Sequence, residues 1–104
     1  MKSEDVRKKH SDYLFPATKN FYKEPIVVTE GKSARVKDLD GNSYLDFFGG
    51  ILTISVGHGN EDVNDAIIAQ VGNLTHISSL YPTVPVVELA EKLSQITPGK
   101  LDKC

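Results

Sequence analysis

The segment DLDGNSY, residues 38–44, constrains the fold of this chain more than any other. It places Asp40-Gly41 between two runs of strand-forming residues, and this dipeptide is a strong signal for a tight hairpin turn. Before the turn, Ala34 and Val36 alternate with charged residues, which is the period of a half-buried strand. After it, residues 44–47 are rich in aromatic residues that favour strands. The pattern predicts an antiparallel hairpin.

A third strand is expected at residues 26–29, where the β-branched run IVVT is followed by a possible turn at Gly31. The predicted result is a three-stranded antiparallel meander over residues 26–48. The spacing of Asp38, Asp40 and Asn42 resembles the start of a calcium-binding loop. The glycine and the downstream glutamate of that loop are missing from their required positions, so a turn-forming role is expected instead.

Helices are predicted on both sides of the meander. Ser3, followed by two acidic residues, is typical of a helix N-cap, and the helix is expected to end near Leu14, ahead of Phe15-Pro16. A second helix is expected after an N-cap at Asn60, and a third is expected to stop at Pro98-Gly99. Two apolar stripes at helical spacing make these last two helices amphipathic: Val63, Ala66, Ile67, Val71 and Leu74, then Val86, Leu89, Ala90, Leu93 and Ile96.

Composition narrows the classes of protein. The 104 residues are 39% hydrophobic and 25% charged, with a net charge of −2, which fits one small globular domain and disfavours nucleic-acid binding. No apolar run approaches the roughly 20 residues of a membrane span. The charged N-terminus has no apolar leader core, so a cytoplasmic location is expected. The single cysteine, Cys104, cannot form an internal disulfide, and no chemistry is expected of it.

No complete active site is evident from the residues themselves. The three histidines lack the spacing of a zinc helix, and no nucleophile elbow or Cys-x-x-Cys pair is present. Gly49-Gly50 is not followed by the lysine of a phosphate-binding loop, and Asp62 occupies the last glycine position of a dinucleotide fingerprint. No catalytic, cofactor-binding or metal-binding residue is predicted, and composition and pattern alone indicate a small α+β domain.

The order of motifs is more specific. From about Pro25 to its end, the chain carries V-x-D-x-D-G-x-x-Y-L-D-F, then G-G-I, then G-H seven residues later, then L-A-E-K-L and P-G. This order resembles the N-terminal portion of class III pyridoxal-phosphate aminotransferases. That group includes 4-aminobutyrate, ornithine, acetylornithine and alanine–glyoxylate transaminases.

The resemblance implies the first part of a larger fold. It divides the chain into a helix and connector (1–25), the meander (26–48), a glycine-rich loop on the substrate side (49–59) and a helical part (60–104). In such enzymes this segment packs on a large cofactor domain and borders the active-site entrance at a homodimer interface. The Schiff-base lysine lies downstream, so pyridoxal 5'-phosphate (PLP) is expected in the intact enzyme but not on this segment alone. The implied substrates are an amino acid or amine and a 2-oxo acid.

The resemblance also suggests four substrate-binding residues. Ile51 matches a position whose side chain faces the substrate, and Gly50 would let the backbone approach it. Tyr81 lies near a position that supplies a pocket wall, and a slip of the match leaves Ser79 as a further candidate. The alternative roles are plain packing for Ile51 and Tyr81 and a bulge for Gly50. His58 matches a histidine to which we assign a structural role, as a turn side chain that bonds the backbone ahead of the Asn60 cap.

Two other functions remain open. The chain could be a non-catalytic fragment that acts only by packing on a partner, since its amphipathic helices would expose apolar surface when alone. The same scaffold also hosts an aminomutase and a decarboxylase. Neither nucleic acid nor a membrane is expected as a partner.

Overall fold

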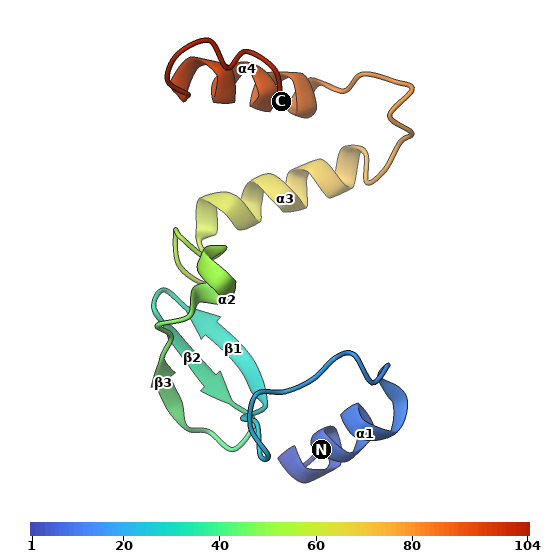
Figure 1. Ribbon diagram of the computed structural model, residues 1–104, viewed down its shortest axis with the longest axis vertical. Helices are drawn as coiled ribbons and strands as arrows, with labels where there is room; N and C mark the ends of the chain where they lie inside the picture. The colour runs from blue at the N-terminus through green and yellow to red at the C-terminus, as the bar shows by residue number, and fades with distance from the viewer. The chain divides into compact units, whose positions relative to one another are not determined.

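The computed structural model describes residues 1–104 and confirms the predicted α+β class (Figure 1). Its elements are α1 (Ser3–Tyr13), β1 (Val28–Lys32), β2 (Arg35–Asp38), β3 (Ser43–Leu45), α2 (Gly49–Leu52), α3 (Glu61–Asn73) and α4 (Val84–Ile96). The chain divides into two units, residues 1–68 and 69–104. Each is described by itself below.

The three strands form the predicted antiparallel meander in the order β1-β2-β3. Gly31 pairs with Val36, and Val36 pairs in turn with Tyr44. The predicted turn joins β2 to β3, and Gly41 adopts a φ of +91°, a conformation that costs glycine little because it has no Cβ. The hairpin at Asp40-Gly41 is therefore confirmed.

Asp38 organises this turn. It is buried, at 5% exposure, and one carboxylate oxygen accepts hydrogen bonds from the backbone N–H groups of Asp40 (3.0 Å) and Asn42 (2.8 Å). The other oxygen accepts from the Asn42 side-chain amide at 3.0 Å and from the Tyr44 hydroxyl at 2.7 Å. The turn-forming role predicted for this aspartate is confirmed.

The first hairpin differs from its prediction. Gly31 lies inside β1, which begins two residues later than expected, and the chain turns at Ser33, whose φ is +52°. The expectation of a turn at Gly31 was wrong because that glycine has another use. A Cβ on Gly31 would lie 2.8 Å from the His58 side chain, so only glycine fits beneath that ring.

The start of α1 also corrects a prediction. Ser3 is the first residue of the helix, and the N-cap is Lys2, whose backbone N–H donates to the Asp5 carboxylate at 3.0 Å. The Ser3 hydroxyl instead donates to Asp40 at 2.7 Å, which ties α1 to the β2–β3 turn. A serine recruited to a distant carboxylate is not available as a cap.

The start of α3 and the end of α4 agree with the predictions. The Asn60 side chain accepts a hydrogen bond from the Val63 N–H at 3.1 Å, which confirms the N-cap of α3. In α4, the N-cap Thr83 is extended and Pro85 is the second helical residue, and the helix gives way to Thr97 just before Pro98-Gly99. No apolar side chain anywhere in the chain is buried, and the large apolar residues of both helices are exposed. None of the helices has the length and apolar character needed to cross a bilayer.

Candidate functional site

The glycine-rich stretch after β3 forms a short turn, α2, with left-handed backbone. Gly49, Gly50, Ile51 and Leu52 have φ values of 55°, 59°, 60° and 64°. Left-handed geometry costs a residue with a Cβ roughly 1–2 kcal/mol, and it is most unusual for β-branched isoleucine. Such strain persists only where the surrounding structure enforces it, and it is frequent at ligand-binding sites.

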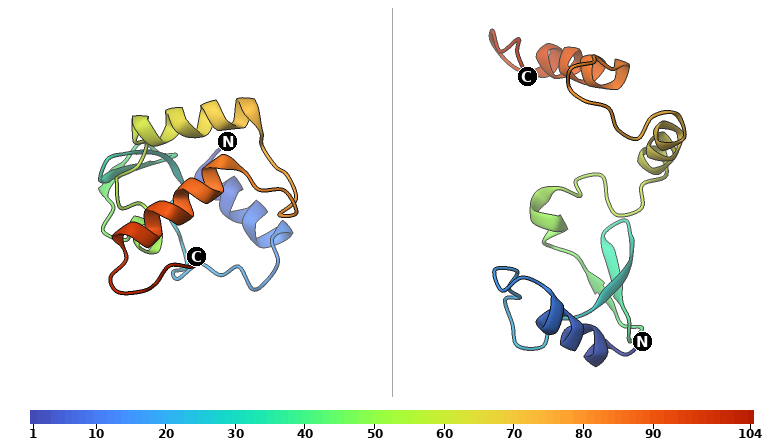
Figure 2. Two further views of the ribbon diagram at one scale, coloured as in Figure 1. Left: turned by 90° about the horizontal axis from the view of Figure 1, so that it is seen from above. Right: turned by 90° about the vertical axis from the view of Figure 1, so that its right-hand side faces the viewer.

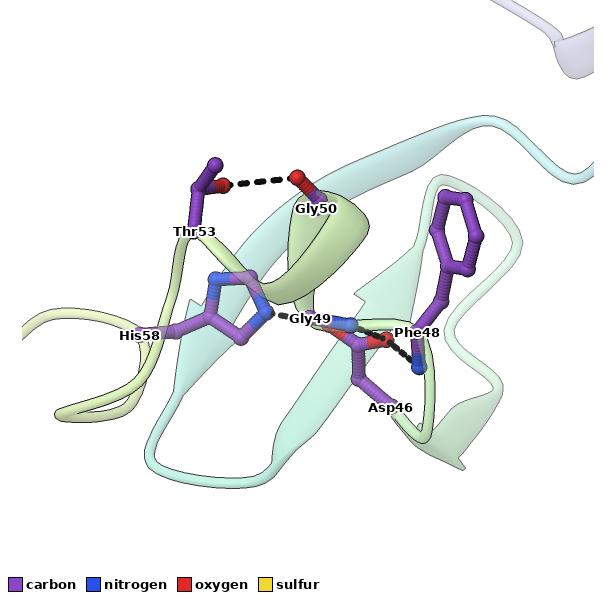
Figure 3. Close-up of polar contacts among 6 residues, drawn as sticks. All are labelled: Asp46, Phe48, Gly49, Gly50, Thr53 and His58. Atoms are coloured by element: carbon purple, nitrogen blue, oxygen red, sulfur yellow. Dashed lines mark hydrogen bonds and ion pairs between the residues drawn. The ribbon is translucent and has the colours of Figure 1, made fainter.

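Asp46, the residue after β3, holds the start of this turn (Figure 3). Its Oδ1 accepts hydrogen bonds from the backbone N–H groups of Phe48 and Gly49, both at 2.9 Å. Its Oδ2 lies 2.7 Å from Nε2 of His58. At the far end, the Thr53 hydroxyl donates to the Gly50 carbonyl at 2.7 Å. The turn is thus fixed at both ends by side chains.

His58 joins the turn to the sheet. Its backbone forms an isolated bridge with Ser33, through hydrogen bonds of 2.8 and 2.9 Å. Its side chain lies over Gly31 and is only 24% exposed, beside an Asp46 that is 15% exposed. The structural role assigned to His58 fits this geometry, but the predicted bond to the backbone was wrong because the ring reaches the Asp46 carboxylate.

The charge on Asp46 is stabilised by this arrangement. The hydrogen bond from His58 lowers the pKa of Asp46, and the N–H groups of Gly49 and Phe48 lower it further. The carboxylate therefore stays ionised to a lower pH than an ordinary aspartate. The ionised Asp46 accepts three hydrogen bonds and so orients the groups that donate them. One of these groups is Nε2 of His58.

A groove of about 490 Å³ runs beside α2 in the first unit. Asp46, His58 and Gly50 are among its lining residues, and most of the others are apolar. A concave, largely apolar surface with a few oriented polar groups is typical of a small-molecule site. The lining is completed by Phe48, just before α2, and by residues of the connector and of the first two strands: Lys19, Asn20, Phe21, Tyr22, Pro25, Ile26, Val28 and Val36.

The four predicted substrate-binding residues fall in two places. Gly50 lines the groove, and a Cβ there would lie 2.7 Å from the Thr53 hydroxyl oxygen. Ile51 follows it with its side chain 71% exposed. Ser79 and Tyr81 belong to the second unit, in the connector between α3 and α4, where the Tyr81 N–H donates to the Ser78 carbonyl at 3.0 Å. All four substrate-binding assignments stay predictions.

The lysines do not fit the aldehyde of PLP, the cofactor that the resemblance implies. A lysine that forms an imine is activated by desolvation or by a neighbouring cation, which lowers its pKa. Every lysine of this chain is exposed. Lys32 lies 2.8 Å from Glu61, and that hydrogen bond raises the pKa of the lysine, the opposite of what activation requires.

Sequence reasoning missed the pairing of Asp46 with His58 and the contributions of Phe21, Tyr22 and Phe48 to the groove. The pair is twelve residues apart, so no helical or strand period relates the two side chains. One signal was present in the sequence. Gly31, Gly57 and Gly59 all lie where a Cβ would crowd the contact between the first hairpin and the turn around His58.

Comparison with known proteins places this geometry in a family. The sequence model of the family Aminotransferase class-III matches residues 17–104. The mitochondrial alanine–glyoxylate aminotransferase 2 of Pongo abelii is 38% identical over 92 residues, which are 88% of this chain and 18% of the relative.

Solved structures agree. An (S)-enantioselective omega-transaminase from Thermomicrobium roseum matches 97% of this chain, and 24% of its own chain, with a TM-score of 0.81 and 30% identity. The ornithine aminotransferase of Toxoplasma gondii matches 91% of this chain, and 22% of its own, with a TM-score of 0.79 and 27% identity. That structure has partial occupancy of PLP at its active site. The chain spans about a fifth of the length of these relatives. With 88 of its 104 residues matched by the family's sequence model, it belongs to the class-III aminotransferases.

Proposed function

We propose that this chain is the N-terminal part of a PLP-dependent transaminase that moves an amino group from an amino acid or amine to a 2-oxo acid. In this proposal its share of the work is to form the rim of the substrate pocket and contacts between subunits. The observation that carries the proposal is the left-handed turn of α2, which is strained at Ile51 and Leu52 and fixed by Asp46, His58 and Thr53. Strain enforced in this way is typical of a ligand site.

Ile51 would act as an aliphatic wall. Its side chain carries no proton donor or acceptor, so it would influence substrate choice through size rather than through proton transfer. Gly50 would leave room beside it, because the groove passes along a residue that has no side chain. Ser79 and Tyr81 would supply a second wall, one with a hydroxyl and the other with an aromatic ring and a hydroxyl.

The imine with PLP would form on a lysine outside these 104 residues. The exposed lysines of this chain do not fit that role. When bound to an enzyme, PLP supplies an electron sink. The aminomutase and decarboxylase alternatives use the same cofactor chemistry. The rim role of α2 would serve them equally, so the reaction class depends on residues elsewhere.

A purely packing role is the second candidate, and the exposed apolar residues of α3 and α4 favour it. Val86, Leu89 and Ile96 are each at least 60% exposed on α4. Exposed apolar patches of this kind mark surfaces that another protein covers. The two candidates agree on the helices and differ in whether α2, Ser79 and Tyr81 line a substrate pocket.

Replacing the matched segment of the Thermomicrobium transaminase with this chain tests the rim role. In this hybrid enzyme, Ile51→Phe is expected to lower kcat/KM for a bulky amino donor about tenfold more than for a small one, because it fills space at the pocket. Ile51→Val is the matched control and should leave that ratio nearly unchanged. An equal loss for all donors, or no loss, would assign Ile51 to packing and favour the second candidate.

A further inference from the structure

A second cavity lies between α1 and the connector that follows it, and it contains no residue of α2. Its volume is about 440 Å³. Figure 2 shows the connector leaving the end of α1 and returning toward the start of β1. The guanidinium of Arg7 donates to the Pro25 carbonyl at 3.3 Å, and the Thr18 N–H donates to the Phe15 carbonyl at 2.9 Å. The first bond ties α1 to the end of the connector, and the second forms a local turn within it.

The cavity is lined by positive charge without compensation. Arg7, Lys19 and Lys23 line it together with the His10 ring, and no aspartate or glutamate does. None of these four side chains takes part in an ion pair. By contrast, Lys8 pairs with Asp12 at 2.6 Å on the same helix. A gathering of unpaired cations is notable in a chain whose net charge is −2.

One feature opposes an anion here. The C-terminal end of α1 carries a partial negative charge of about half an elementary charge, and it lies at this cavity, where His10, Ser11 and Leu14 are among the lining residues. Three whole positive charges outweigh it. The hydroxyls of Ser11 and Thr18 add hydrogen-bond donors that a phosphate can use.

We propose that this cavity binds the phosphate group of a small molecule. A guanidinium presents a planar fork of donors that matches phosphate oxygens, and ammonium groups supply point charges beside it. Arg7 and His10 precede residue 17, where the match to the family's sequence model begins, whereas Lys19 and Lys23 lie within that match. The proposal does not depend on the function proposed for α2.

A titration of the full 104-residue chain, labelled with ¹⁵N, tests this site with inorganic phosphate as the probe. Sodium chloride keeps the ionic strength constant, because exposed charges are screened by salt. Phosphate is expected to cause saturable shifts of the amide resonances of residues 7–25. The double variant Lys19→Gln/Lys23→Gln should weaken binding by about tenfold or more, as two charge-assisted contacts are lost.

The matched control is Lys9→Gln/Lys37→Gln, which removes the same charge at two exposed lysines outside the cavity and should leave binding unchanged. Glycerol phosphate distinguishes the source of the phosphate. Equal affinity for both probes indicates free phosphate, and tighter binding of the ester indicates a phosphorylated metabolite. Absence of saturation, an equal effect of the control, or tighter binding of succinate than of either phosphate would overturn the proposal.

Discussion

The segment from β1 to His58 and the segment from residue 69 onward hold their shapes by different means. In the first, two aspartates each hold several groups: Asp38 fixes the β2–β3 turn through residues up to six positions away, and Asp46 bonds the His58 side chain twelve residues away. In the second, every side-chain hydrogen bond but one joins residues four or fewer apart. The exception is the bond from Cys104 to the Ala90 carbonyl.

This difference indicates which part of the chain needs a partner. The meander and the turn α2 that follows it are fixed by polar contacts within the chain itself. The helix α4 has 13 residues, near the length at which an isolated helix is marginal in water, and its large apolar residues are exposed. Its sequence is therefore suited to burial against a surface, whereas the meander presents a preformed shape.

Acid is expected to have the largest effect and to act on the first segment. The Asn42 amide and the Tyr44 hydroxyl lower the pKa of Asp38, against an opposing effect of burial, and His58 lowers that of Asp46. A lowered folded-state pKa means that the stabilisation is present above the ordinary aspartate value of about 3.9 and is lost as the pH falls through the lowered value. The Asn42 and Gly49 amide resonances should therefore shift toward random-coil positions only below about pH 4.

Matched variants separate the two aspartates in this titration. Asp46→Asn should abolish the acid shift of the Gly49 amide and leave that of Asn42 in place, and Asp38→Asn should do the reverse. If the resonances of both amides instead move to random-coil positions near neutral pH, the carboxylates are not what fixes the two turns.

A glycine-to-alanine pair is expected to give the next largest effect, with opposite signs in the two segments. Gly31→Ala would place a Cβ 2.8 Å from the His58 side chain, and overpacking of this kind typically costs about 1–3 kcal/mol. Gly72→Ala, in α3, meets no atom within 4 Å and should stabilise the helix by at most about 1 kcal/mol. Amide hydrogen exchange of the β1–β2 ladder and of α3 measures both. If the amides of α3 exchange faster in Gly72→Ala than in the unsubstituted chain, the expected opposite signs of the two substitutions are contradicted.

The same contrast explains which features the sequence revealed. The Asp40-Gly41 turn and the Asn60 cap depend on neighbours within a few residues, and both were predicted correctly. Ser3 and His58 were assigned local partners, but their side chains bond to Asp40 and Asp46, which are 37 and 12 residues away. Local patterns cannot identify partners at such separations. The left-handed backbone of Ile51 was equally hidden, because its own residue type disfavours it.

The smallest effect is expected on the exposed face of α4. Leu89 is 60% exposed, so Leu89→Gln removes little buried apolar surface, and the two residues have similar helix propensities. In the free chain, the stability of the helix over residues 84–96 should change by less than about 0.5 kcal/mol. Cα chemical shifts of these residues measure this change. In the hybrid transaminase, the same variant should lower the yield of assembled enzyme, because there the face is expected to be covered. A loss of helicity in the free chain would mean that Leu89 is already covered without a partner, and the contrast between the two segments would then fail.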